Sequence, residues 1–428
     1  MNKIYLPCKR PYVGLVIATI FLFISLSVVF SSRDASLYGT LAALNKVSSP
    51  LEISTLQVGT FVAIFLSLAI IFNTLGRRIR KDAKLISSIT VVGAFFIFWF
   101  TQKISLGLSF GSNFKFQDLY TLVIFSAVVI ARHEKILCQI RLLKLVLLIL
   151  SVAGIFFLEL SPAIVKQVEY SNAIYFDYRY WGLSTHANNL GPLMVLFGVL
   201  LFFFPYKNRN IQLAAYSVVL FSVVASQSKT TLYSCFGAIF LYQFVYISDL
   251  ANKSGRQRWL LSIILVAIII INSIILLFGK ILTLNQYLTG RGDIWTISML
   301  EFAAAPWFGG GANVWSNRFS EKYGYLGIAS NAHNQVLDTL SLSGVAGFVA
   351  LIYFLFTMVK VANLQNRIGH AFTWLLLFLM LRGFSEVPFR LGVAMSNDFG
   401  ILLVLGMLAV GSIKSVNVKK LVNFRNEN

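Results

Sequence analysis

Apolar runs of about twenty residues recur along this chain, and they constrain its fold more than any other feature. Such a run is long enough to cross the hydrocarbon layer of a membrane as a helix. Apolar and aromatic residues make up 57% of the 428 positions and charged residues only 12%. A soluble protein needs a larger share of polar residues to cover its core. Because backbone groups in lipid must bond to one another, and β-barrel alternation is absent, the sequence predicts an all-α polytopic membrane protein.

The apolar runs predict about twelve transmembrane helices. We expect these spans at residues 12–30, 54–75, 85–101, 118–131, 142–160, 187–204, 211–227, 230–248, 259–279, 335–359, 371–381 and 396–413. Since the sequence shows no repeat, low-complexity tract or linker, residues 1–428 are expected to form a single integral membrane domain. The connection 280–334, between spans nine and ten, is predicted to be a functional loop, because long connections in compact proteins often carry function.

The basic residues predict the orientation of the spans. The chain has a formal net charge of +20, and most of its Lys and Arg residues follow an even number of predicted crossings. The positive-inside rule then places these segments and both termini in the cytosol, and the loop 280–334 on the periplasmic side. Basic residues that flank membrane spans also account for the positive charge. Nucleic-acid binding is not expected, because no basic stripe with interleaved aromatics lies outside the spans.

The segments predicted on the outer side contain two candidate catalytic residues. His333 carries an imidazole, the side chain best suited to proton transfer near neutral pH, although a structural role at a helix start is the alternative. Arg291 carries a planar guanidinium that suits a phosphate, although an interfacial anchor paired with Trp295 is the alternative. Glycines on both sides of Arg291, and later at 309–311, indicate backbone that approaches another group closely.

Further cations are predicted on the same side at Arg179, Lys229 and Arg382. A snorkelling side chain is the alternative for Lys229, and an ion pair with Glu386 is the alternative for Arg382. The chain has no metal-binding motif and no nucleotide-phosphate loop, so neither metal nor cofactor is expected. A one-sided cluster of cations suits an anionic lipid-linked substrate such as a lipid pyrophosphate.

Motifs between about residues 175 and 390 resemble those of the O-antigen ligase and Wzy-type O-antigen and exopolysaccharide polymerase superfamily. The motifs are RYWGLSTHANNLGP (179–192), SQSKTTLY (226–233), LTGRGDIW (288–295), PWFGGGANVW (306–315), AHNQVLDTLSLSGVAGF (332–348) and LRGFSEVPF (381–389). Each motif is loose alone, and the resemblance depends on their order, spacing and common sidedness.

The resemblance implies a GT-C-like glycosyltransferase of the bacterial inner membrane, which uses an undecaprenyl-pyrophosphate-linked glycan donor at the periplasmic face. Arg291 and His333 match the loop arginine and loop histidine of the family and are expected to be catalytic. Lys229 stands where many relatives have Arg, so this position lacks the planar paired donors with which an arginine binds a phosphate. The residues expected to bind pyrophosphate or glycan are Arg179, Lys229, Arg382, Asn334 and His186.

Three functions remain open at the level of sequence. A polymerase moves the growing chain onto a new lipid-linked repeat unit, with a chain-length regulator as a possible partner. An O-antigen ligase moves the glycan onto lipid A–core, and the sequence separates these two reactions poorly. A transporter of lipid-linked glycan is less favoured, because transporters usually show repeat halves and polar residues at the membrane midplane.

Overall fold

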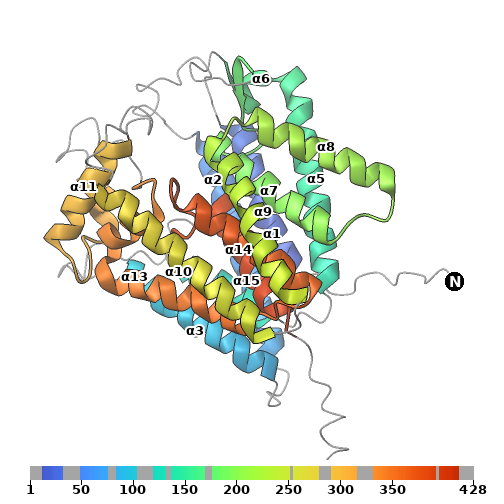
Figure 1. Cartoon of the computed structure of the whole chain (residues 1–428). Coiled ribbons are helices and arrows are strands. Elements are labelled where there is room, and N and C mark those ends of the chain that lie inside the picture. Colours follow the sequence, from blue (N-terminus) through green and yellow to red (C-terminus); the bar gives the residue numbers. More distant parts are fainter. Residues whose placement is uncertain are drawn as a thin grey trace, which may run out of the picture.

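The structure is a computed structural model that shows a bundle of helices (Figure 1). It describes residues 12–31, 49–75, 83–103, 119–131, 136–168, 176–250, 254–278, 291–315, 331–391 and 395–413. The long helices are α1 (Tyr12–Phe30), α2 (Pro50–Leu75), α3 (Ala83–Lys103), α4 (Leu119–Ile130), α5 (Ile136–Leu160), α7 (Ala187–Phe203), α8 (Arg209–Ala225), α9 (Lys229–Leu250), α10 (Ser254–Phe278), α13 (Gln335–Val361), α14 (Arg367–Arg382) and α15 (Asn397–Gly411). The shorter elements are α6 (Pro162–Val165), β1 (Lys166–Val168), β2 (Tyr178–Tyr180), α11 (Arg291–Ala304) and the 3-10 helix η4 (Ala312–Trp315).

The long helices occupy the positions of the predicted spans, with ends shifted by a few residues. Seven helices in the described part of the chain are long and apolar enough to cross a membrane, judged by length and composition. Helices α4, α7, α8 and α15 are apolar but shorter. The chain is therefore a multi-pass α-helical membrane protein, and the full count of twelve spans stays a prediction.

Both the core and the outer surface of the bundle are apolar. Leu376 of α14 and Leu403 of α15 are fully buried, whereas Phe65 and Phe72 of α2 are 74% and 71% exposed. Exposed rings of this size are unfavourable in water, but lipid tails are as apolar as leucine. The outward-facing apolar side chains therefore fit a membrane perimeter.

Segments that the charge pattern placed on the same side of the membrane contact one another at one end of the bundle. Arg258 Nη2 donates a hydrogen bond to the carbonyl of Ala362 at 3.2 Å. Lys144 Nζ donates to the carbonyl of Phe204, and the guanidinium of Arg367 lies 5.7 Å from the Phe204 ring. These contacts join the connections after α7, α9 and α13, as expected if they share one membrane face. The assignment of that face to the cytosol stays a prediction.

The segments predicted as outer connections contain secondary structure that the sequence did not predict. Strands β1 and β2 pair antiparallel, with Gln167 opposite Arg179. Within the predicted loop 280–334, the described part contains helix α11 and η4, so this stretch is not a loop throughout. Strands of three residues and a single helix in a polar connection are too short to give a strong periodic pattern. Residues 280–290 and 316–330 of that loop lie outside the described residues.

Helix α13 is broken at Gly344, where φ is +63° and ψ is −161°. The segment 306–311 packs against this break. Backbone N–H groups of Gly310 and Gly311 donate to two carbonyls before the break at 2.8 and 3.0 Å, and two N–H groups after it donate back to the segment at 2.9 and 3.0 Å. A Cβ on Gly309 would lie 2.3 Å from the α13 backbone, so glycine is required by this close approach.

Candidate functional site

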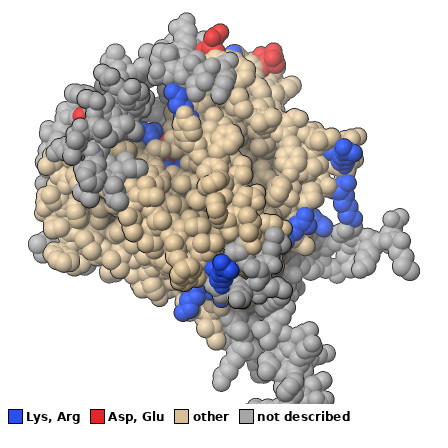
Figure 2. All heavy atoms as spheres, in the orientation of Figure 1, with Lys and Arg blue, Asp and Glu red and all other residues tan. Residues whose placement is uncertain are grey.

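Segments far apart in the sequence meet where α7, α9, α11 and α13 begin. Arg179 Nε donates to the carbonyl of Ser226 at 3.1 Å, and the Ser385 hydroxyl donates to Thr230 Oγ1 at 3.0 Å. Arg291 Nη1 donates to the carbonyl of Ser385 at 2.5 Å. In Figure 2, basic side chains lie in a recess at the upper left of the molecule, near α11. The predicted outer segments therefore do form one cluster.

Glu386 lies at the centre of this cluster. Its carboxylate is largely buried, with 10% of the side chain exposed. Oε1 accepts hydrogen bonds from Arg291 Nη2 at 3.1 Å and from Asn188 Nδ2 at 2.9 Å. Oε2 lies 3.4 Å from His333 Nδ1. One carboxylate thus holds the two predicted catalytic residues beside each other.

The surroundings of Glu386 keep its carboxylate ionised. Burial alone raises the pKa of this group, because a charge is costly away from water. The hydrogen bond from His333 and the positive charges of Arg382, His333 and Arg291 outweigh burial and lower the pKa of Glu386 to about 2. The cation cluster therefore contains a fixed negative charge at neutral pH.

Arg291 is the first residue of α11, and 18% of its side chain is exposed. Its bonds to Ser385 and Glu386 use two N–H groups, and the other donors of the guanidinium have no partner among the described residues. The N-terminus of a helix adds partial positive charge at this position. Arg291 is thus fixed in place and still able to bind an anion.

Trp295 does not act as the interfacial anchor that the alternative for Arg291 required. Its side chain is buried, with 9% exposed, and it packs with Ala332 and Leu337. The ring therefore fastens α11 to the start of α13.

His333 adopts a left-handed backbone conformation with φ of +46°. Its N–H donates to Asn331 Oδ1 at 2.7 Å, and 30% of its side chain is exposed. When Nδ1 carries the proton that faces Glu386, Nε2 is the unprotonated nitrogen. A strained residue that is held by a local hydrogen bond and a carboxylate is a feature of functional sites.

Arg382 is buried, with 1% of its side chain exposed. Nη1 donates to Asp398 at 2.6 Å, and Nη2 donates to the carbonyl of Asn188 at 3.1 Å. The ion-pair alternative for Arg382 therefore describes the geometry, with Asp398 as its bonded partner in place of Glu386. Its predicted contact with substrate stays a prediction, and its place in the structure is that of a support behind Glu386.

Asn334 is also fully buried and caps the start of α13. Its Oδ1 accepts from two backbone N–H groups of the first helical turn at 3.0 and 3.1 Å. Its Nδ2 donates to Asn272 Oδ1 at 2.8 Å and to the carbonyl of Phe384 at 3.0 Å. Because its amide hydrogen bonds are used within the protein, the geometry favours a structural role over the predicted substrate contact.

Arg179 and His186 flank Asn188 from the segment before α7. Arg179 Nη2 donates to Asn188 Oδ1, and His186 Nδ1 accepts from the Asn188 N–H at 3.1 Å as the cap of α7. Asn188 in turn donates to Glu386. The predicted binding residues Arg179 and His186 are therefore linked to the centre of the cluster through Asn188.

Lys229 differs from the other predicted cations. It is exposed at the start of α9, and no described residue pairs with its ammonium group. Its neighbour Thr230 contacts Ser385, whose carbonyl binds Arg291. Lys229 is therefore an exposed cation whose neighbour in the chain contacts the segment that holds Arg291.

Sequence reasoning placed Glu386 and Asn188 in the right segments but missed their central role. Glu386 was considered only as an ion-pair partner, and Asn188 only as part of a motif. The sequence did contain a signal for Glu386, because this acid lies among the predicted outer cations in the motif LRGFSEVPF. Among the residues that the structure describes, no three His, Cys, Asp or Glu side chains are grouped to hold a metal ion.

Residues 214–352 match the profile of a protein family described as O-antigen ligase. This range contains Lys229, Arg291, His333 and the break of α13 at Gly344. The match confirms the resemblance that the motifs predicted, and it supports membership of the O-antigen ligase and Wzy superfamily. No curated protein matches the chain. The match supports a membrane enzyme of the O-antigen ligase or polymerase type, which transfers glycans.

Proposed function

We propose that this enzyme polymerises undecaprenyl-pyrophosphate-linked oligosaccharide repeat units at the periplasmic face of the bacterial inner membrane. The observation that carries the proposal is the joining of Arg291 and His333 through Glu386 at one end of a membrane-helix bundle. A phosphate-binding cation beside a base is the pair of groups that this transfer needs. The proposal includes cytosolic termini and a GT-C-like architecture.

Arg291 and Lys229 bind the donor pyrophosphate in this proposal. Arg291 is held in place by Ser385 and Glu386, so it loses little freedom when it binds an anion. Lys229 supplies a charge that no described acid neutralises. Negative charge grows on the pyrophosphate as the sugar leaves, and fixed cations stabilise that charge without reorganising.

His333 accepts the proton from the acceptor sugar. The acceptor hydroxyl oxygen forms a bond to the anomeric carbon of the donor glycan, and the bond from that carbon to the pyrophosphate breaks. Undecaprenyl pyrophosphate leaves with the bonding electrons, and the hydroxyl proton moves to His333 Nε2. Glu386 faces Nδ1 at 3.4 Å, so it orients the imidazole and stabilises the imidazolium that forms.

The partners follow from this chemistry. The donor already carries an activated sugar, so the proposal involves neither a nucleotide sugar nor a cofactor. The partners are the lipid-linked donor, a glycan or lipid-linked acceptor, the surrounding lipid and a chain-length regulator.

Transfer of the glycan to lipid A–core is the second candidate function. The matching family is described as O-antigen ligase, and the match supports both reactions equally. The two reactions share the donor and the proposed roles of Arg291 and His333. They differ only in the acceptor hydroxyl.

The experiment that separates the candidates offers the purified protein both acceptors. Lipid-linked repeat units alone are incubated first, and the products are resolved by size. A ladder of longer glycans supports the polymerase. Absence of a ladder, with glycan attached to lipid A–core when that acceptor is added, replaces it with the ligase. Movement of unchanged lipid-linked glycan across vesicles, without new glycosidic bonds, supports the transporter.

A further inference from the structure

The first turn of α13 contacts both the segment that carries His333 and the segment that carries Glu386. Two polar side chains of this turn are buried and have no part in the proposed chemistry. Asp338 is fully buried, and Gln335 is 5% exposed. Residues three apart on a helix lie on the same face, so both side chains leave α13 on one side. Buried polar groups are costly unless they are bonded, so their partners indicate what they do.

Asp338 bonds back to the segment before α13. Its Oδ1 accepts a hydrogen bond at 3.1 Å from the N–H of Ala332, the residue before His333. The N–H of His333 itself donates to Asn331 Oδ1 at 2.7 Å. A left-handed backbone, such as that of His333 with φ of +46°, is unfavourable for a residue other than glycine and persists only where surrounding bonds hold it. Asp338 is thus the residue of α13 that fixes the backbone beside His333.

Gln335 bonds to the segment of Glu386 on both sides of that residue. Its N–H donates to the carbonyl of Gly383 at 2.8 Å, and its Oε1 accepts from the N–H of Phe389 at 2.8 Å. Glu386 lies midway between these two positions in the chain. The Gln335 Nε2 donates to Thr339 Oγ1 at 3.0 Å, so the amide is held from its own helix as well. The first turn of α13 therefore holds the Glu386 segment at two points.

The second oxygen of Asp338 faces the same segment. Oδ2 has no hydrogen-bond partner among the described residues and lies 3.9 Å from Arg390 Nε. A carboxylate buried away from water is costly unless a nearby cation compensates its charge. Arg390 lies four residues after Glu386 in the chain. Asp338 therefore joins the His333 segment by a hydrogen bond to the Glu386 segment by an ion pair.

We propose that Asp338 and Gln335 are positioning residues that hold His333 and Glu386 in register for the transfer. The proposal rests on the proposed function, because it concerns the base of that reaction. His333 Nδ1 and Glu386 Oε2 lie 3.4 Å apart and come from different segments. Since both segments are bonded to one helical turn, that turn sets their separation. A small displacement of a base from its acceptor lowers the rate, so the two residues act through His333 and Glu386.

The first test separates the hydrogen bond of Asp338 from the presence of a side chain. In the full-length protein, Asp338→Ala should lower kcat about tenfold to a hundredfold, because the buried N–H of Ala332 loses its partner and the His333 segment moves. The donor KM should stay within about twofold, because the contacts of Arg291 are unchanged. Asp338→Asn keeps an acceptor oxygen for Ala332, so its kcat should stay within about fivefold of wild type.

The second test concerns the Glu386 side. Gln335→Met keeps the volume of the side chain and removes the acceptor for Phe389, so it should lower kcat without a matching change in the donor KM. It also tests the same claim in the event that Asp338→Ala does not fold. Thr357→Val is the matched control, because it removes a buried hydroxyl that bonds within the other half of α13. The control should keep kcat within about twofold of wild type.

Equal losses in Asp338→Asn and Asp338→Ala would overturn the proposal, because the acceptor for Ala332 would then not matter. Parallel losses in kcat and donor affinity, or losses no greater than that of Thr357→Val, would also overturn it.

A spectroscopic measurement does not depend on turnover. Nitrogen NMR of the protein with isotope-labelled histidine rings reports which ring nitrogen carries the proton, and His333→Gln assigns the signals of His333. Wild type and Asp338→Asn should show one fixed tautomer, with the proton on Nδ1, and Asp338→Ala should show the averaged signals of a freely moving ring. Unchanged signals in Asp338→Ala would overturn the proposal. The expected signals in a protein that forms no glycosidic bond would reject the proposed function and keep the positioning role.

Discussion

Replacement of Glu386 by Gln removes one charge from the cluster and keeps the shape of the side chain. The pKa of Glu386 is lowered from its ordinary value of 4.5 to about 2. A difference of this size corresponds to about 3 kcal/mol of folding free energy, because each pKa unit is worth about 1.4 kcal/mol. Glu386→Gln should therefore destabilise the protein by about 3 kcal/mol at neutral pH.

The sign of the pH dependence follows from the direction of the shift. The folded-state pKa lies below the unfolded-state value, so the ionised carboxylate stabilises the fold at pH values above 4.5. This contribution is lost as the pH falls from 4.5 toward about 2. The difference between wild type and Glu386→Gln should stay constant from about pH 8 to about pH 5 and shrink at lower pH.

The assay is unfolding of the detergent-solubilised protein by increasing amounts of a denaturing detergent, followed by circular dichroism. Glu159→Gln is the matched control, because Glu159 is an exposed carboxylate on α5. The control should lie within about 0.5 kcal/mol of wild type. A Glu386→Gln protein as stable as this control at neutral pH would refute the reasoning that Glu386 is an ionised, paired group.

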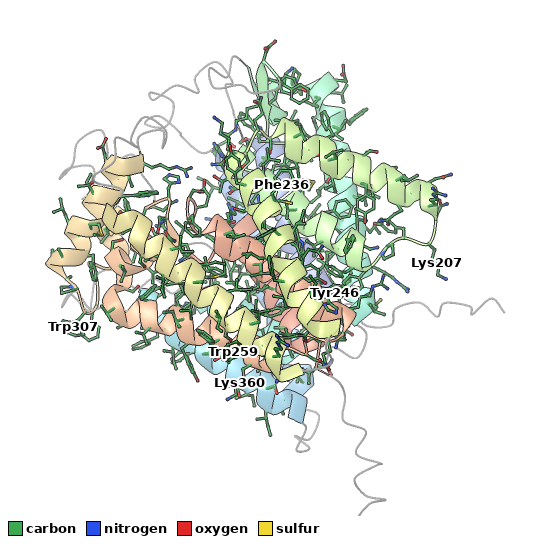
Figure 3. The ribbon with its side chains drawn as sticks, viewed as in Figure 1. Lys207, Phe236, Tyr246, Trp259, Trp307 and Lys360 are labelled. Carbon is green, nitrogen blue, oxygen red and sulfur yellow. The ribbon has the colours of Figure 1, made fainter. Side chains whose placement is uncertain are left out.

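The remaining predictions concern single side chains of the cluster and of the α13 break. Arg291→Lys should lower kcat/KM for the donor by about tenfold to a hundredfold, because a lysine lacks the paired planar donors; unchanged steady-state kinetics would reject paired phosphate binding. Lys229→Ala should raise the donor KM by about tenfold without a change in unfolding free energy. Lys360→Ala is its control, since Lys360 is an exposed residue at the far end of α13, seen low in Figure 3, and a similar loss there would reject a specific role for Lys229. Gly309→Ala should destabilise the protein by several kcal/mol, since its Cβ would lie 2.3 Å from the α13 backbone. Gly93→Ala on α3 is its control and should change stability by less than about 1 kcal/mol, because a Cβ there meets no described atom within 4 Å. Equal melting temperatures of the Gly309→Ala and Gly93→Ala proteins would contradict this account.

The positions of the helices could be predicted because long apolar runs carry their own signal. The spans that the sequence predicted and the helices of the structure differ by only a few residues at their ends. The break at Gly344 could not be predicted in this way. The break depends on hydrogen bonds between α13 and the segment 306–311. Gly344 lies within an apolar run, and nothing in that run indicates that the segment 306–311 packs against it.

The residues of the site could also be predicted, but the contacts between them could not. The count of basic residues by crossing placed Arg291 and His333 on one side, and they do lie in one cluster. The bonds of Glu386 reach 95 residues back to Arg291 and 198 residues back to Asn188. Contacts of that range depend on how helices pack, which no local pattern encodes.

The same distinction explains why two predicted binding residues have structural positions. Arg382 and Asn334 lie in the predicted segments, but both are buried and bonded within the protein. Burial of a polar side chain at a helix end depends on its neighbours in space. Residue type and sidedness alone therefore could not separate the groups that support the site from those that are open to a ligand.

The central claim is that the Arg291–Glu386–His333 cluster transfers a glycan from a lipid pyrophosphate. The most direct measurement follows release of undecaprenyl pyrophosphate by the purified protein together with formation of the new glycosidic bond. Wild type and Lys360→Ala should give equal amounts of both products, and Arg291→Ala and His333→Gln should give neither at a comparable rate. Wild-type rates in properly folded Arg291→Ala or His333→Gln proteins would contradict the account.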